Sequence, residues 1–208
     1  MNIQLLHRLG AGVAVVGAAL GLAGCGTLLD VDFPGRIPAS NVDNPTLAPI
    51  LARSVIGDFE CAYNNYTGGN SAHSDEFESS NGNVPGSNWG ERSISAGEDD
   101  FAIGGCEVNG ATASYFGMPA PLGTARFQSE DIFAKLSGWT DAQVTGRGNL
   151  LAQVRTYGAY SYLLMGETFC QVAFDGGAPQ PAAAALAKAE TQFAEAVTLS
   201  TTAGNTDM

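Results

Sequence analysis

Residues that could carry catalysis are sparse in this chain and follow no catalytic motif. Beyond position 7, His73 is the single histidine of the 208 residues, and it lies in a polar stretch beside Asp75 and Glu76. No GxSxG, HExxH or P-loop pattern is present. Nucleophilic catalysis needs a base beside its nucleophile, and glycoside hydrolysis needs two carboxyls across a cleft. We therefore expect no enzymatic activity, no cofactor and no metal.

Binding chemistry is better represented, in a segment rich in Gly, Ser and Asn. Trp89 lies there beside Asn88 and close to Arg92, and Tyr115 and Phe116 follow. Flat aromatic faces with a few placed polar groups around them are typical of sugar sites. These five residues are the predicted ligand-binding residues, against the alternative that Trp89 fills the core under a long loop.

A cysteine follows an apolar run near the N-terminus. Residues 10–22 contain no charge, and 13 residues are too few to span a bilayer, which takes about 20. The run has the form of a secretory signal, and Leu22-Ala23-Gly24-Cys25 resembles the bacterial lipobox. We expect residues 1–24 to be a lipoprotein signal peptide, Cys25 to be lipidated, and residues 25–43 to form a linker to this anchor.

Three cysteines remain after Cys25, namely Cys61, Cys106 and Cys170. Because export favours disulfides, we expect one disulfide and one buried free thiol. A bridge from Cys61 to Cys106 would fix the middle segment to the preceding helix, whereas one from Cys61 to Cys170 would join two helices. The spacing does not choose between them, and the absence of a CxxC or Cys/His cluster argues against zinc.

The charge balance limits the possible partners. There are 21 acidic and nine basic residues, for a net charge of −12. Nucleic-acid binding is dominated by Lys and Arg on phosphates, so we exclude nucleic acid as a partner. The same acidic charge argues against docking on an anionic lipid surface by charge.

The apolar spacing predicts four helices and a mainly α fold. The first begins near Asn44 and Pro45, with Pro49 displacing its start, and ends at Gly68-Gly69. An irregular insertion is expected over 67–120. A helix ending at Gly138 follows, then a buried central helix capped by Asn149. The apolar face of the last helix is expected to comprise Leu186, Ala189, Phe193, Ala196 and Val197.

The last two helices have a spacing found in tetratricopeptide units. Ala189, Phe193 and Ala196 follow a small-aromatic-small pattern, and Ala159 and Tyr162 fit the preceding helix of such a pair. We therefore predict tetratricopeptide-like helix pairs in an α-α superhelix with a long irregular loop region. The alternative is ordinary helix packing that happens to use alanines.

Taken in order, these pieces resemble the N-terminal part of the SusD/RagB family. The lipobox is followed by Leu28-Leu29-Asp30-Val31, then by the helix beginning near Asn44, and an aromatic-rich helix over 157–166 loosely matches a family motif. Residues 166–170 depart from the commonest form of that motif. The resemblance implies a SusD-like helical domain over 44–208, which we expect to be incomplete at its C-terminus.

The resemblance also implies a function. Members of the family are outer-membrane lipoproteins that bind nutrients, often glycans, and act with a SusC-like TonB-dependent transporter. We expect a lipid-anchored, cell-surface protein that binds an oligosaccharide or another nutrient. The alternative is a tetratricopeptide-like periplasmic lipoprotein scaffold that binds protein partners, which would have no need of the long middle segment.

Overall fold

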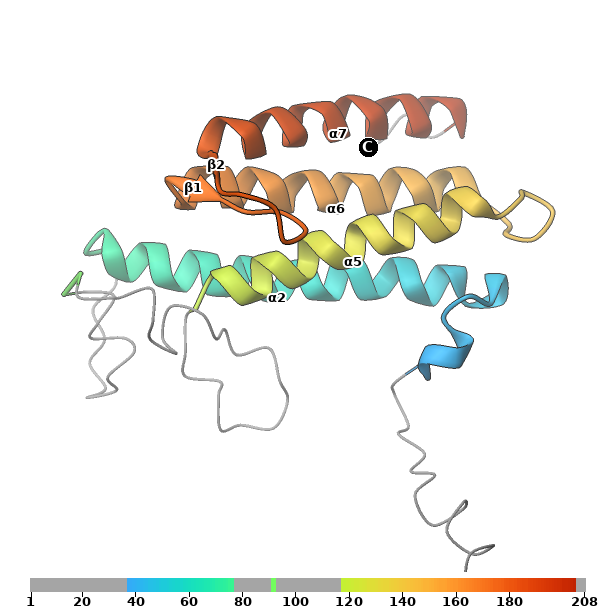
Figure 1. Ribbon diagram of the computed structural model, residues 1–208. Coiled ribbons are helices and arrows are strands. Elements are labelled where there is room, and N and C mark those ends of the chain that lie inside the picture. The colour runs from blue at the N-terminus through green and yellow to red at the C-terminus, as the bar shows by residue number, and fades with distance from the viewer. Residues whose placement is uncertain (1–36, 77–90, 93–116, 205–208) are drawn as a thin grey trace, which may run out of the picture. The chain divides into compact units, whose positions relative to one another are not determined.

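The structure, a computed structural model, describes residues 37–76, 91–92 and 117–204 (Figure 1). The chain divides into two units, residues 1–41 and 42–208. The described part of the first contains the 3-10 helix η1 (Ala39–Asn41). In the second, the described residues are mainly helical, with the 3-10 helix η2 (Pro45–Leu47), four α-helices and one two-stranded hairpin. The expected mainly α fold is confirmed.

Helix α2 (Ala48–His73) starts as the sequence predicts and extends further than expected. The Asn44 side chain accepts a hydrogen bond from the Thr46 amide at 3.1 Å, and η2 precedes the α-helix, whose start is displaced to Ala48. The predicted end at Gly68-Gly69 is wrong. A glycine costs a helix about 1 kcal/mol, but Gly69 and Ala72 are buried, and this packing outweighs the cost.

Helix α5 (Pro119–Gly138) ends at the predicted glycine, and α6 (Arg147–Thr168) follows after a short connection. The predicted cap at Asn149 is wrong, because α6 begins at Arg147 and its N-cap is Gly146. Gly146 has a φ of 70°, a left-handed conformation that glycine adopts without strain, and this turns the chain into the helix. The end of the predicted irregular insertion at 120 is also wrong by two residues, since α5 begins at Pro119.

Helix α6 is central, as predicted. It contacts α2, α5 and α7 (Ala182–Thr202), and Figure 1 shows it between α7 and the α2/α5 pair. Strands β1 (Gln171–Val172) and β2 (Gln180–Pro181) pair antiparallel and connect α6 to α7. Helices α6 and α7 are therefore antiparallel neighbours. No helix of the described ranges is long and apolar enough to cross a membrane.

The apolar face of α7 is only partly the predicted one. Ala189 and Ala196 are buried, but Leu186 is 40% and Val197 62% exposed. Close approach of α6 and α7 depends on small residues: a Cβ on Gly166 would lie 2.6 Å from Leu186 Cδ2. The α6/α7 pair therefore agrees with the predicted small-residue contacts, and a tetratricopeptide superhelix stays a prediction.

Candidate functional site

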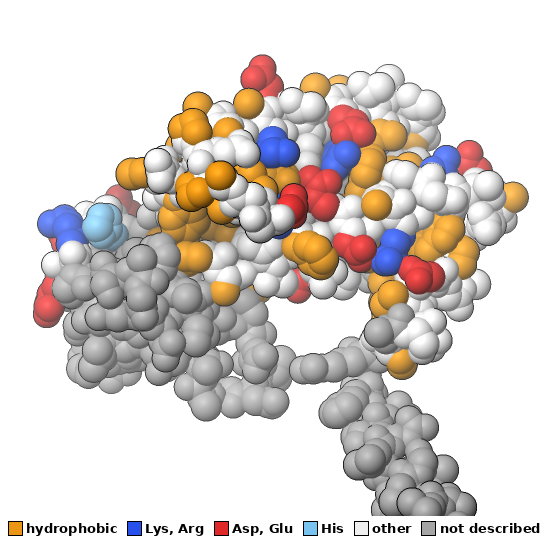
Figure 2. Space-filling view, viewed as in Figure 1, with side chains coloured by type: hydrophobic (Ala, Val, Ile, Leu, Met, Phe, Trp, Pro, Cys, Tyr) orange, Lys and Arg blue, Asp and Glu red, His pale blue; other side chains and the backbone are white. Residues whose placement is uncertain are grey.

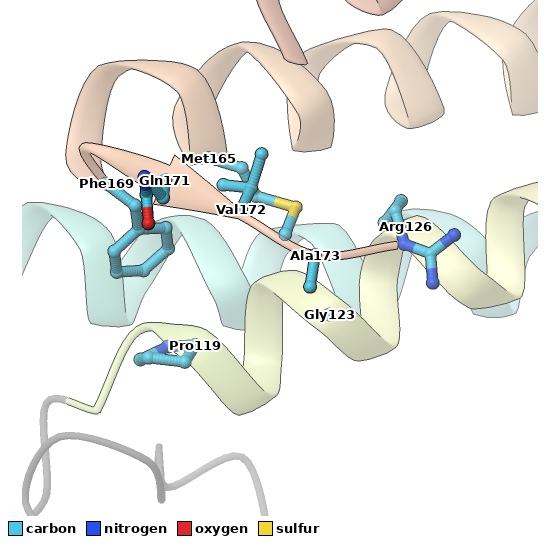
Figure 3. A pocket seen from close by; sticks show the side chains of 8 residues that line it. All are labelled: Pro119, Gly123, Arg126, Met165, Phe169, Gln171, Val172 and Ala173. Carbon is cyan, nitrogen blue, oxygen red and sulfur yellow. The ribbon is translucent and has the colours of Figure 1, made fainter. Parts of the chain in front are cut away.

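A pocket of about 260 Å³ lies where the start of α5, the end of α6 and strand β1 meet (Figure 3). Its lining is mostly apolar and consists of Pro119, Gly123, Arg126, Met165, Phe169, Gln171, Val172 and Ala173. Figure 3 shows Arg126 at one end of this lining and Phe169 and Pro119 at the other. An apolar pocket with one placed charge is the usual composition of a small-molecule site.

Arg126 is the charged group of this pocket. The residue is only 8% exposed, and its Nη1 donates to an oxygen of Asp175 at 2.9 Å, while Asp175 itself is exposed. Burial lowers the pKa of Arg126, but hydrogen bonds with Tyr162 and Asp175 outweigh it, so the net pKa is raised. The guanidinium is therefore held charged at the edge of an apolar space.

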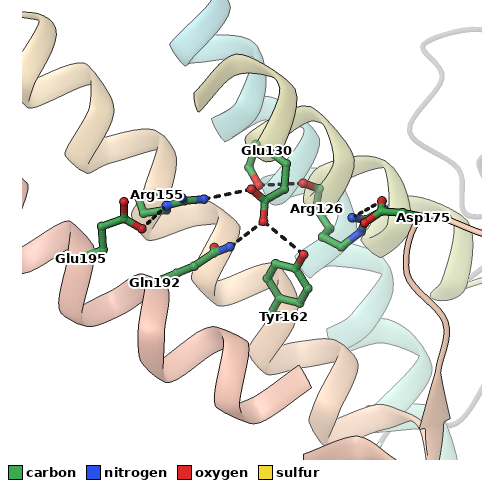
Figure 4. A network of polar contacts seen from close by, with 8 residues as sticks. Arg126, Glu130, Arg155, Tyr162, Asp175, Gln192 and Glu195 are labelled. Atoms are coloured by element: carbon green, nitrogen blue, oxygen red, sulfur yellow. Dashed lines mark hydrogen bonds and ion pairs between the residues drawn. The ribbon is translucent and has the colours of Figure 1, made fainter. Parts of the chain in front are cut away.

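A polar network beside the pocket fixes the helices that form it (Figure 4). The carboxylate of Glu130 on α5 accepts from Arg155 Nη1 at 2.9 Å, from the Tyr162 hydroxyl at 3.1 Å and from Gln192 Nε2 at 2.6 Å. Arg155 also donates Nε to Glu195 at 2.6 Å. One carboxylate thus joins α5, α6 and α7, and its donors satisfy it, so the network is structural.

Charged side chains in this part of the molecule are mostly paired. Figure 2 shows Lys and Arg next to Asp and Glu across the visible face. Arg155 also lies over an aromatic ring, with its Cζ 3.6 Å from the Phe133 centroid. Such pairing leaves few charges on this face for a ligand. Arg126 is also paired, but it is the one charged residue that lines the pocket.

A second feature is a row of aromatic rings on α2. The rings of Phe59 and Tyr63 lie 6.0 Å apart at an interplanar angle of 19°, and those of Tyr63 and Tyr66 lie 6.3 Å apart at 16°. Tyr63 is 49% exposed. The sequence does not mark these residues as a site, because their spacing is also that of a buried helix stripe.

The row continues onto α6 and α7. Tyr160 lies 5.7 Å from the Phe59 ring and meets Phe193 edge-on at 4.8 Å. Tyr160 is 41% exposed, and the Tyr66 hydroxyl donates to Glu167 at 3.0 Å. The aromatic face is defined here as Phe59, Tyr63, Tyr66, Tyr157, Tyr160 and Phe193. It offers exposed rings with a carboxylate at one end.

Of the predicted ligand-binding residues, only Arg92 lies in the described part of the chain. It pairs with Asp75 at 2.8 Å and donates to the His73 carbonyl at 3.2 Å, so it holds the end of α2. His73 is the last residue of that helix. Asn88, Trp89, Tyr115 and Phe116 lie outside the described residues, as do Cys25 and Cys106.

The cysteines resolve one question of pairing. Cys61 is disulfide-bonded, and Cys170 is a free thiol. The Cys61–Cys170 alternative is therefore wrong. The free thiol is also exposed, where the sequence predicted a buried one, because Cys170 lies past the end of α6 in the turn before β1.

Over residues 37–76, 91–92 and 117–204, no group of His, Cys, Asp and Glu is arranged to hold a metal ion. Comparison of the chain with protein families, curated proteins and solved structures gives no match. The pocket and the aromatic face are thus the two features from which a function can be argued.

Proposed function

We propose that this protein is a lipid-anchored, cell-surface binding protein of the SusD/RagB type that holds an oligosaccharide for a SusC-like TonB-dependent transporter. It acts by binding and not by catalysis. The observation that carries the proposal is the aromatic face, with Tyr63 and Tyr160 each more than two-fifths exposed on packed helices.

Exposed aromatic rings are costly to keep in water unless something covers them. The C–H faces of sugar rings suit such rings, and the hydroxyls of a sugar can meet the Tyr66 hydroxyl and the Glu167 carboxylate. Phe59 and Tyr66 lie seven residues apart, which is about 10 Å along a helix. A row of that length offers stacking positions to more than one sugar ring.

The acidic charge of the chain favours a neutral ligand. With a net charge of −12 and Glu167 at the end of the aromatic face, an anionic polysaccharide would be repelled. A neutral oligosaccharide is not repelled by this negative charge. The proposal therefore names neutral glycans as the first ligands to test.

The test is affinity electrophoresis in gels containing neutral polysaccharides, with the variant Tyr63→Ala/Tyr160→Ala. We expect the wild-type chain to be retarded by at least one polysaccharide and the variant to run freely. Phe127→Ala is the matched control, since Phe127 is 55% exposed on α5 and takes part in none of the ring contacts above. Equal retardation of the Tyr variant and the wild type would contradict the proposal.

The anchor and the transporter need separate tests. Cys25→Ser should move the protein from the membrane to the soluble fraction, and unchanged membrane association would exclude the anchor. Affinity purification of the wild-type protein from detergent-solubilised membranes should recover a β-barrel transporter.

A second candidate is a tetratricopeptide-like periplasmic scaffold that binds proteins, and the exposure of Leu186 and Val197 on α7 favours it. In the same purification, this candidate predicts soluble periplasmic proteins without a barrel. The variant Val197→Asp should then lose them while keeping its fold, whereas recovery of the barrel would be unaffected under the first proposal.

A further inference from the structure

The pocket beside Arg126 has a polarity along its length. Arg126 lies at one end and Phe169 at the other, with Met165 and Val172 between them (Figure 3). A ligand that fills it must therefore be apolar over most of its length and carry its polar group at the Arg126 end. The pocket shares none of its residues with the aromatic face, so the inference below does not depend on oligosaccharide binding.

The charge at the Arg126 end favours an anionic polar group. Lys188 Nζ and Arg126 Cζ lie 5.5 Å and 5.7 Å from the centroid of the same ring, that of Phe174. Two cations thus lie near one aromatic residue in a chain that is acidic overall. These two cations would repel a cationic head group, and an uncharged one would gain little from them.

Arg126 can accept a second carboxylate. Asp175 meets its Nη1 with one oxygen at 2.9 Å, and a guanidinium has five N–H donors. Asp175 is exposed, on the segment between β1 and β2, and so it can move away into water at little cost. The pair can therefore exchange, because Arg126 is buried on the pocket side and Asp175 is exposed on the solvent side.

The volume limits the ligand. At about 260 Å³ the pocket lies just below the range of roughly 300–1,000 Å³ that is usual for small-molecule sites, so its ligand must be small. A medium-chain carboxylate such as octanoate is a ligand of this class.

From these four observations we propose that this pocket binds an apolar monocarboxylate, with its carboxylate on Arg126 in place of Asp175 and its hydrocarbon part toward Phe169. Two interactions contribute. The hydrocarbon part leaves water, and a charge-assisted hydrogen bond forms at the edge of a space of low dielectric.

The experiment is isothermal titration calorimetry of octanoate, with octan-1-ol and octyltrimethylammonium as probes of the same chain length. The protein is the full chain with Cys25→Ser, so that no lipid at that residue competes for the pocket. We expect octanoate to bind at least tenfold more tightly than either probe, the ratio expected when a charged hydrogen bond is made by one ligand only.

Two variants assign the effect to Arg126. Arg126→Met should reduce octanoate binding to the level of octanol, and Asp175→Asn should strengthen octanoate binding several-fold by removing the competing carboxylate. Asp141→Asn is the control, because Asp141 pairs with Arg147 at 2.8 Å in a similar geometry and neither residue lines the pocket. Equal binding of octanoate and octanol by the wild-type chain would overturn the proposal. So would a loss of octanoate binding in Asp175→Asn, a variant in which the exposed substitution leaves the fold intact.

Discussion

Glu130 of α5 and Gln192 of α7 are joined by a hydrogen bond of 2.6 Å, although 62 positions separate them and both helices pack on α6. The same carboxylate accepts from Arg155 and Tyr162 on α6. Three helices therefore depend on one side chain for their relative position. The pocket includes residues of α5 and α6, and the aromatic face includes residues of α6 and α7, so the network fixes helices that contribute to each of them.

Glu130→Ala should lower the free energy of unfolding by about 1–3 kcal/mol, because it leaves three donors on α6 and α7 without their acceptor. Chemical denaturation followed by far-UV circular dichroism measures this. The neighbouring Asp131→Ala is the control. Asp131 is more exposed and makes a surface pair with Lys135 at 3.5 Å, for which a change below about 1 kcal/mol is expected. Equal losses of unfolding free energy in the two variants would show that the Glu130 network adds nothing to stability.

Gly158→Ala should also destabilise the protein, in spite of the better helix propensity of alanine. A Cβ there would lie 2.6 Å from Ser129 Oγ and 2.9 Å from Gln192 Oε1. Both side chains are held by hydrogen bonds, Ser129 to the Arg126 carbonyl at 2.8 Å and Gln192 to Glu130. We expect a loss of about 1–2 kcal/mol.

Gly57→Ala is the matched control for Gly158→Ala. Gly57 is exposed in the middle of α2, and a Cβ there meets no atom within 4 Å. This change should raise the melting temperature, since alanine is favoured over glycine in a helix by about 1 kcal/mol. Stabilisation by Gly158→Ala as well would mean that α5, α6 and α7 are not packed as closely as the structure has them.

The hydroxyl of Tyr66 gives a prediction at high pH. Burial and the hydrogen bond to Glu167 raise the pKa of Tyr66 from 10.0 to about 12. The folded protein therefore holds this proton more tightly than the unfolded chain does, and stability falls as the pH rises from 10 to 12. Tyr66→Phe should reduce that fall, as measured by denaturation at pH 9 and pH 11. An unchanged pH dependence, or a Tyr66 that titrates near pH 10 in absorbance, would contradict the assignment.

The helices were predictable where their signals are local. Asn44 and Pro45 start the first helical segment, Gly138 ends α5, and the apolar run of α6 places that helix at the centre. The end of α2 was not predictable in this way. Gly69 stays helical because it is buried against other elements, and a glycine that packs cannot be distinguished in the sequence from one that ends a helix.

The residues of the candidate site were even less predictable from the sequence, because tertiary contacts bring them together. The spacing of Phe59, Tyr63 and Tyr66 fits a core stripe and an exposed row equally well, and the buried face of α2 turns out to consist mostly of small residues such as Ala52 and Ala62. The contacts that form the pocket, such as Arg126 with Asp175, join residues 49 positions apart. No local spacing carries that information.

The cysteines give the last prediction, because the structure assigns them different states. Cys170 is a free, exposed thiol, and Cys61 is disulfide-bonded. Iodoacetamide applied to the native protein without reductant should therefore modify Cys170, and peptide mapping should find Cys61 unmodified until reductant is added. Cys170→Ser should leave stability unchanged within about 0.5 kcal/mol, as for most exposed substitutions. Cys61→Ser should cost about 2–4 kcal/mol, since the cross-link restricts the unfolded chain. Modification of Cys61 without reductant, or a cross-linked peptide that contains both Cys61 and Cys170, would contradict the pairing and restore the alternative that the two helices are joined directly.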